Sequence, residues 1–278
     1  MKRILFLVFL AGGLVPFAVS AADKPHAAKS TAQTAKAGKM TAAQIVDRNV
    51  AARGGLKAWR AVHTLTLSGR MEAGGKKNPA LPFVMKMKRP HMTRLEIVFQ
   101  GKTALQVYDG ENGWKIRPFL GRNEVEPFTP AEARAASDWQ ELDGPLVDYA
   151  AKGTKVTLQG METVEKHKTY KLQLTLRNGE ERHVWVDASS FLELKMEGEP
   201  RMLDGKLRNV SIFYRDYKKE NGLNIPHVLE TVVDTGKQAH KMYIEHVAAN
   251  EAMEDALFAK PQLTVVNASA QQAVPMAK

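Results

Sequence analysis

The chain of 278 residues contains no cysteine. Without thiols it forms no disulfides, offers no thiolate to a metal ion and cannot carry a thiol-linked lipid anchor. Three motifs of common enzyme classes are also missing: a glycine-rich phosphate loop, an H-E-x-x-H zinc motif and a G-x-S-x-G nucleophile elbow. These absences exclude a disulfide scaffold and the enzyme classes that those motifs mark.

Long apolar runs are scarce as well, and the main one lies at the start of the chain. Lys2-Arg3 precedes an apolar stretch over residues 4–19, which glycines and a proline interrupt and small residues follow. This order is typical of a secretory signal peptide, and the run is too short for a comfortable membrane span. We expect residues 1–22 to be cleaved after Ala21 or Ala22 and the protein to be periplasmic. An uncleaved anchor is the alternative.

The charge balance is basic, with 40 Lys and Arg against 30 Asp and Glu, a formal net charge of +10. Removal of Lys2 and Arg3 with the signal peptide leaves +8 (10 − 2). Such an excess favours weak contact with anionic membranes. Export argues against a nucleic-acid partner, and the sequence shows no aromatic stacking platform for nucleic-acid bases.

The mature sequence divides into three parts by composition. Residues 23–40 are rich in alanine and lysine and have no apolar period, which predicts a flexible tether. Residues 41–266 carry regular patterns and form the predicted domain. Residues 267–278 are expected to be a loose tail.

Apolar and polar residues alternate along most of the domain. A period of two places alternate side chains on one face, and short turn sequences join the runs as antiparallel neighbours. About eleven such strands predict a mainly β (α+β) fold, an incomplete and strongly curved antiparallel β-barrel with helices as its lid. The residues expected on the apolar face of the first strands are Phe83, Met85, Met87, Leu95, Ile97, Phe99, Leu105 and Val107.

Three helices are predicted among the strands. Thr41 and Gln44 form a capping box that begins a helix over residues 42–53, and Trp59 follows in a short second turn. Thr129 and Glu132 form another box, which predicts a helix over about residues 130–137. A further helix is expected from Gly144-Pro145 to the stop at Gly153. We expect the last two helices, which interrupt the run of strands, to lie across the sheet.

Groups that could do chemistry are scattered. The eight histidines show no metal-ligand spacing, so we expect no metal, no cofactor and no enzymatic activity. The methionines on the apolar face fit two interpretations equally: ordinary core packing, or a cavity that accepts variable apolar ligands.

An ordered set of short motifs gives the chain a resemblance to the periplasmic lipoprotein carrier LolA and its relatives, from about residue 41 to 266. The motifs and segments are Lys88-Arg89-Pro90, Tyr108-Asp109-Gly110, Trp114, the helical insertion over residues 130–139, and Phe258-Ala259-Lys260-Pro261. The second half of the chain is longer than in the classical carrier and is more similar to the broad group of outer-membrane lipoprotein-sorting proteins.

The resemblance implies an incomplete barrel whose helical lid encloses a hydrophobic cavity for acyl chains, with no cofactor and no catalysed reaction. It further implies a monomer that carries lipoprotein acyl chains or other lipids, with donor and acceptor proteins in the membranes. Arg89 matches the family's lid arginine. We expect its guanidinium to bind carbonyl groups at the end of the helix that starts at Pro130. The alternatives are an envelope interaction module with a self-filled core, and an enzyme with convergent polar groups in the cavity.

Overall fold

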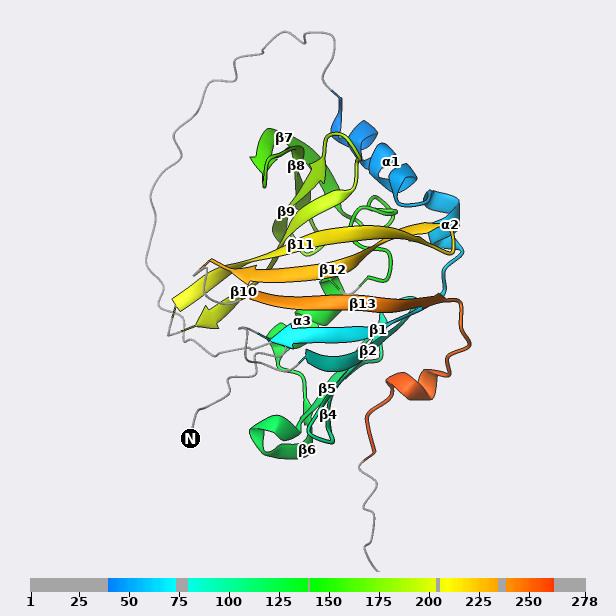
Figure 1. Cartoon of the computed structure of the whole chain (residues 1–278), viewed down its shortest axis with the longest axis vertical. Helices are drawn as coiled ribbons and strands as arrows, with labels where there is room; N and C mark the ends of the chain where they lie inside the picture. Colours follow the sequence, from blue (N-terminus) through cyan, green and yellow to red (C-terminus); the bar gives the residue numbers. More distant parts are fainter. Residues whose placement is uncertain (1–39, 74–79, 140, 204–205, 235–238, 263–278) are drawn as a thin grey trace, which may run out of the picture.

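The computed structural model shows how the domain is arranged around one sheet (Figure 1). It describes residues 40–73, 80–139, 141–203, 206–234 and 239–262. The expected signal peptide, nearly all of the expected tether and the expected tail lie outside the described residues. No helix within the described part is long and apolar enough to cross a membrane.

Thirteen strands form a single antiparallel sheet, in the order β6-β5-β4-β3-β2-β1-β13-β12-β11-β10-β9-β8-β7. The first and last strands in sequence, β1 and β13, pair at its centre, and all other pairs join sequence neighbours. β6 and β7 are the two edges and do not pair with each other, so the sheet curves without closing. The incomplete antiparallel barrel predicted from the alternation is confirmed.

The strand bounds follow the alternating runs closely. In the first half they are β1 Thr64–Ala73, β2 Ala80–Lys88, β3 Met92–Phe99, β4 Lys102–Tyr108, β5 Gly113–Arg117 and β6 Arg122–Pro127. In the second half they are β7 Lys155–Val164, β8 His167–Thr175, β9 Glu181–Asp187, β10 Glu193–Leu203, β11 Lys206–Glu220, β12 Leu223–Val233 and β13 Ala239–Ala249.

The two strands beyond the expected eleven are the edges, whose sequences carry the weakest alternation. β6 has valine as its only aliphatic residue. β7 contains a register shift between Leu158 and Gly160, where the backbone of Gly160 takes φ +138°. An irregularity of this kind breaks the period of two from which a strand is recognised.

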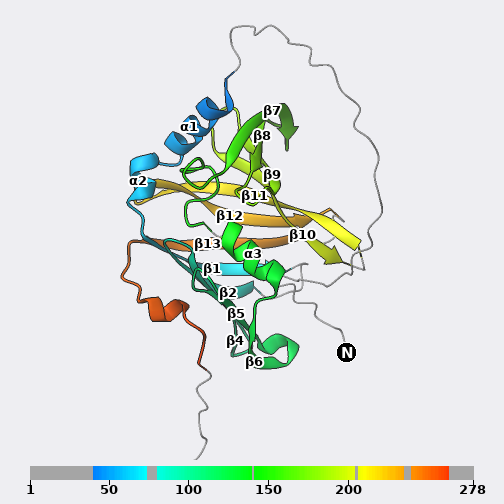
Figure 2. The same ribbon diagram turned by 180° about the vertical axis from the view of Figure 1, so that it is seen from behind.

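Both predicted capping boxes are present. In α1 (Ala42–Ala52) the Thr41 amide donates to Gln44 Oε1 at 2.9 Å, and the Gln44 amide donates to the Thr41 hydroxyl at 3.2 Å. α2 (Leu56–Arg60) follows and contains Trp59. Thr129 caps α3 (Pro130–Trp139), which contacts β5 and is seen in front of the central strands in Figure 2. Two short 3-10 helices, η1 (Pro118–Leu120) and η2 (Asp255–Phe258), complete the described elements.

The prediction of a helix from Gly144-Pro145 to Gly153 is wrong, because residues 141–153 form a series of turns. Asp148 sits inside this stretch with φ +52°, in the left-handed region that ends a right-handed helix. Its carboxylate accepts hydrogen bonds of 2.9 and 2.6 Å from the Arg60 guanidinium. A long-range contact therefore accompanies a backbone conformation that the local sequence does not predict.

The expectation that Leu105 and Val107 share a face with Leu95 and Ile97 is also wrong. In the β3–β4 register Leu95 lies opposite Gln106, and Leu105 lies opposite Glu96. Alternation identifies which residues of one strand share a face. The turn decides which residues of the next strand lie on that same face. Leu105 and Val107 instead join an outer cluster with Met253 and Phe258.

The C-terminal segment around η2 covers this outer cluster. Basic side chains on the outer face hold it, because Lys88 donates to the Met253 carbonyl at 2.6 Å and Arg94 donates to the Leu257 carbonyl at 2.9 Å. Phe258 is fully buried there. The sheet thus has a small core on its outer face as well as the large one on its inner face.

Replacing Phe258 by alanine should lower the free energy of unfolding by about 3–5 kcal/mol, because it empties the centre of the outer cluster. Urea denaturation measures the change. The matched control is Leu207→Ala, an exposed side chain whose loss should change stability by about 0.5 kcal/mol or less. Equal midpoints for the two variants would contradict the described role of the C-terminal segment.

Candidate functional site

The inner face of the sheet brings together six of the eight side chains predicted for the apolar site. Phe83, Met87, Leu95 and Ile97 are buried in the large core cluster, and Met85 and Phe99 pack against it partly buried. Leu105 and Val107 lie on the other face. The curved inner face of β1 to β3 is therefore the candidate site.

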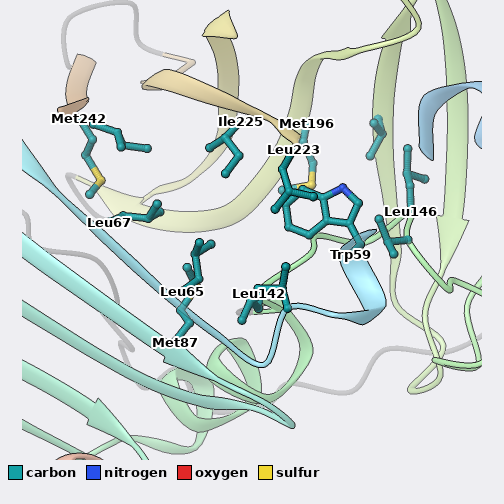
Figure 3. Close-up of a cluster of buried hydrophobic side chains, with 14 of the residues drawn as sticks. Trp59, Leu65, Leu67, Met87, Leu142, Leu146, Met196, Leu223, Ile225 and Met242 are labelled. Carbon is teal, nitrogen blue, oxygen red and sulfur yellow. The ribbon is translucent and has the colours of Figure 1, made fainter. Parts of the chain in front are cut away.

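Side chains from outside the sheet cover this inner face. Trp59 of α2 belongs to this cluster, and Leu142, Leu146, Met196 and Leu223 are grouped around it (Figure 3). Ile45 and Val46 of α1 belong to the same cluster. Phe83 and Ile97 retain only 2% and 1% of their exposed area. In this conformation the protein's own side chains occupy the space that an apolar ligand would need.

An open groove lies outside this packed interior. It has a volume of about 290 Å³ and runs between α1 and the turns at residues 146–151. Val46, Val50, Leu146 and Tyr149 are among its walls. A second hollow, beside Leu95 and Ile97, has only about 10 Å³. The larger groove is near the lower limit of typical small-molecule sites.

Arg89 lies in the turn after β2 with a partly exposed side chain, and its partners differ from the expected ones. Its guanidinium donates to the Val62 carbonyl at 2.8 Å, to the Trp59 carbonyl at 3.1 Å and to Asp143 Oδ2 at 2.6 Å. The Trp59 carbonyl lies in α2 and Val62 follows that helix, so the predicted contact with the end of α3 is wrong. Arg89 joins the β2–β3 turn to α2 and to the 141–153 segment.

Asp143 is the centre of a wider polar network. Its carboxylate side chain is 1% exposed and also accepts from Lys152 at 2.6 Å, while its carbonyl accepts from Arg53 Nη1 at 2.7 Å. Lys152 binds Glu141 as well. Burial raises the pKa of the Glu141 carboxyl, although the Lys152 ammonium opposes this shift. The network ties the 141–153 segment to both α1 and the sheet.

Arg53, at the end of α1, connects this network to β10 and β11. Its guanidinium lies 3.3 Å from Glu193 and stacks 4.5 Å from the centre of the Trp59 ring. The Tyr217 hydroxyl donates to the Glu193 carbonyl at 3.0 Å. Burial raises the pKa of the Tyr217 hydroxyl, and the nearby Glu193 carboxylate raises it further. The tyrosine therefore stays a neutral donor in the physiological range.

The corner between α1 and α2 is anchored to the β11–β12 hairpin. The Asn224 amide donates to the Arg53 carbonyl at 2.9 Å, and its side chain donates to the Ala52 carbonyl at 3.1 Å. Gly54 permits this approach, because a Cβ atom there would lie 2.6 Å from the Gly222 carbonyl oxygen. These contacts hold the corner in a fixed position on the sheet.

The N-terminal end of α3 is anchored by a buried ion pair. The Lys115 ammonium of β5 binds the Glu132 carboxylate, and both side chains are buried. Glu132 also accepts from the Thr129 amide at 2.7 Å and so completes the capping box. Sequence reasoning found this box but missed Lys115, and it missed Arg53, Asp143 and Lys152 altogether. No local pattern marks them, since their partners are distant in sequence.

Several charged groups of the site form ion pairs, some of them buried, and the core cluster on the inner face of the sheet consists of apolar side chains. Within the described residues no three His, Asp or Glu side chains come together in a way that could hold a metal ion. A small number of polar contacts therefore helps to hold the covering segments over the apolar inner face.

Comparison with solved structures identifies the architecture. A LolA superfamily protein from Nitrosomonas europaea superposes with a TM-score of 0.54 at 14% identity, over 80% of this chain and 99% of that one. The fold is LolA-like. A DUF1329 family protein from Desulfovibrio piger gives 0.53 at 15% identity over 78% and 97% of the two chains. No family model and no curated protein matches the sequence.

A third structural neighbour is a putative outer membrane lipoprotein-sorting protein domain from Vibrio parahaemolyticus. It has a TM-score of 0.51 at 13% identity and covers 77% of this chain and 94% of that domain. Likenesses at such low identity establish the fold alone. They confirm the architecture implied by the motifs around Arg89 and the α3 insertion.

Lys115→Met should lower the free energy of unfolding by about 3–5 kcal/mol, because it leaves the buried Glu132 carboxylate without its counter-ion. The double variant Lys115→Met/Glu132→Gln should recover most of that loss, since glutamine keeps the capping box and removes the unpaired charge. Chemical denaturation of both variants provides the measurement. If the double variant is no more stable than the single one, the pair is not what fixes this end of α3.

Proposed function

We propose that this protein is a periplasmic carrier that binds the acyl chains of lipoproteins or other lipids and moves them toward the outer membrane. The observation that carries the proposal is a LolA-like sheet with an apolar inner face, covered by segments that polar contacts hold in place. Two of the structural neighbours are named for the LolA superfamily and for outer membrane lipoprotein sorting.

Apolar burial would supply the affinity, at roughly 0.8 kcal/mol for each CH₂ group removed from water. Because Trp59, Leu142 and Leu146 fill the closed interior, an acyl chain must displace some of them. The α1–α2 corner and the N-terminal end of α3 are anchored. We therefore assign the opening movement to the 141–153 segment, which polar contacts to Arg89 and Arg53 hold closed.

The proposed carrier acts as a monomer without cofactor or catalysis, and residues 1–22 are removed on export. Residues 41–266 form the carrier domain, after the tether of residues 23–40. The net positive charge gives the protein weak affinity for anionic membranes, where donor and acceptor proteins would meet it.

A second candidate is a non-enzymatic interaction module of the envelope with a self-filled core. The burial of Phe83 and Ile97 under the protein's own side chains favours it. In that case the edge strands β6 and β7 would be the surfaces available for pairing with a partner strand.

The carrier should retain lipid when purified from the envelope without detergent, and native mass spectrometry should detect the added mass. Binding of a fluorescent acyl probe to variants then tests where on the protein the acyl chain binds. Met87→Ala, on the inner face, should weaken probe binding several-fold. The matched control Leu105→Ala removes an equally buried side chain from the outer cluster and should lower stability without changing affinity.

Two outcomes oppose the carrier proposal. A lipid-free protein that binds no acyl probe saturably would favour the self-filled module. Equal loss of probe affinity in the Met87 and Leu105 variants would show that the inner face is not the binding surface.

Arg89→Leu should speed release of the acyl probe about tenfold, because it removes the charged hydrogen bond to Asp143 that helps to hold the 141–153 segment closed. The free energy of unfolding should fall by about 2 kcal/mol or less, since the Arg89 side chain is already 30% exposed. Stopped-flow release beside a denaturation curve separates the two effects. Arg70→Leu, at an exposed ion pair on β1, is the control. Release at the wild-type rate would show that Arg89 does not hold the segment closed.

A further inference from the structure

The β10–β11 hairpin extends past the neighbouring strands at one side of the sheet (Figure 1). The register between β9 and β10 ends at Met196, and that between β11 and β12 ends at Val210. Beyond these positions the described register continues only between β10 and β11, in the pairs Arg201–Arg208, Met202–Leu207 and Leu203–Lys206. Residues 201–203 and 206–208 therefore form a two-stranded ribbon, here called the β10–β11 tip.

The β10–β11 tip carries apolar residues outside the core. Leu207 is 66% exposed, more than any other large apolar side chain of the described residues. A single exposed leucine is common on protein surfaces. Here, however, the register places Met202 directly opposite Leu207, and directly opposite residues of an antiparallel pair lie on one face. The ribbon thus has an apolar pair where no further strand of the described sheet lies beside it.

Basic residues flank this apolar pair. Lys206 is exposed, Arg208 is partly exposed, and Arg201 lies opposite Arg208 in the register. Like charges directly opposite each other on neighbouring strands are destabilising, so this pairing costs stability in the free protein. The Arg208 guanidinium lies 3.9 Å from the Asp234 carboxylate, a long contact for an ion pair. In sequence, residues 201–208 hold these three basic residues against one acidic residue, Asp204.

This combination of surfaces fits the interface of an anionic lipid bilayer. Headgroup phosphates attract lysine and arginine, and the region just below them accepts apolar side chains. An acidic peptide would neutralise the basic residues but leave Leu207 in water. A purely apolar partner would cover Leu207 but leave the positive charges without counter-ions. An anionic bilayer satisfies both requirements at once.

We propose that the β10–β11 tip is a membrane-contact site that binds the surface of anionic bilayers. Leu207 enters the bilayer interface, and Lys206 and Arg208 bind lipid phosphates beside it. The site extends the proposed carrier function, on which its purpose rests, by naming the surface at which the protein meets a membrane. Binding at this tip requires no acyl ligand on the inner face of the sheet, so the two functions are tested separately.

The first test is co-sedimentation of the mature chain with vesicles of equal parts phosphatidylcholine and phosphatidylglycerol, beside vesicles of phosphatidylcholine alone. The wild-type protein should bind the anionic vesicles about tenfold more tightly. Leu207→Ser should weaken that binding about tenfold, because it removes the apolar side chain that enters the interface. The matched control is Leu120→Ser, at a leucine of η1 that is 49% exposed, which should change binding by less than about twofold.

The second test concerns charge. Lys206→Gln should weaken binding to the anionic vesicles about fivefold at low salt, the contribution of one basic residue near an anionic surface. High salt should abolish this difference, because it screens the attraction. Lys102→Gln, at an exposed lysine of β4, is the control and should bind as the wild-type protein does.

A third measurement guards against a folding defect. Because the chain has no cysteine, Leu207→Cys offers a single thiol for an environment-sensitive fluorophore. Its fluorescence should rise when anionic vesicles are added, since the label enters the apolar part of the interface. The same label on Leu120→Cys should show little change. A loss of fold cannot imitate a gain of signal at one position and not at the other.

The outcomes separate the membrane contact from the carrier function. Equal vesicle binding by the wild-type protein, Leu207→Ser and Lys206→Gln would overturn the β10–β11 tip as the contact site. So would an equal fluorescence rise from the labels at positions 207 and 120. Equal binding to both kinds of vesicle would overturn the anionic partner. Failure of the acyl probe to bind in solution would instead overturn the carrier function and leave the membrane contact standing.

Discussion

Burial of the inner face of the sheet is the constraint on which the rest of the structure depends. An open antiparallel sheet with one apolar face is stable in water only when something covers that face. Here Trp59 and the leucines of the 141–153 segment provide the cover. Any apolar ligand on this face would have to displace some of these side chains.

The cover is attached in two physically different ways. The α1–α2 corner is held by backbone contacts at Gly54 and Asn224, and the start of α3 by a buried ion pair. The 141–153 segment is held by hydrogen bonds to charged side chains, among them the partly exposed Arg89. Leu142, Leu146 and Val147 of this segment are buried in the core as well, so apolar packing and polar contacts together hold it in place.

Local patterns predicted much of this molecule correctly. The capping boxes at Thr41 and Thr129 were recognisable because both partners lie within one turn. Their helices begin where those boxes predict. The helix expected to end at Gly153 failed because Asp148 takes a left-handed backbone conformation and binds Arg60, which lies far away in the sequence. The helix starts that depend on contacts within one turn were predicted correctly, whereas the helix whose residues make long-range contacts was not.

The sequence by itself determined that the domain is a curved antiparallel sheet with one apolar face, because alternation and turn residues act over a few neighbouring positions. It also determined that Phe83, Met85 and Met87 share that face. Only the tertiary structure decided that Leu105 and Val107 face outward, since the turn before β4 sets the phase between strands. It alone decided that Arg89 binds Asp143, because ion pairs between distant segments leave no local signal.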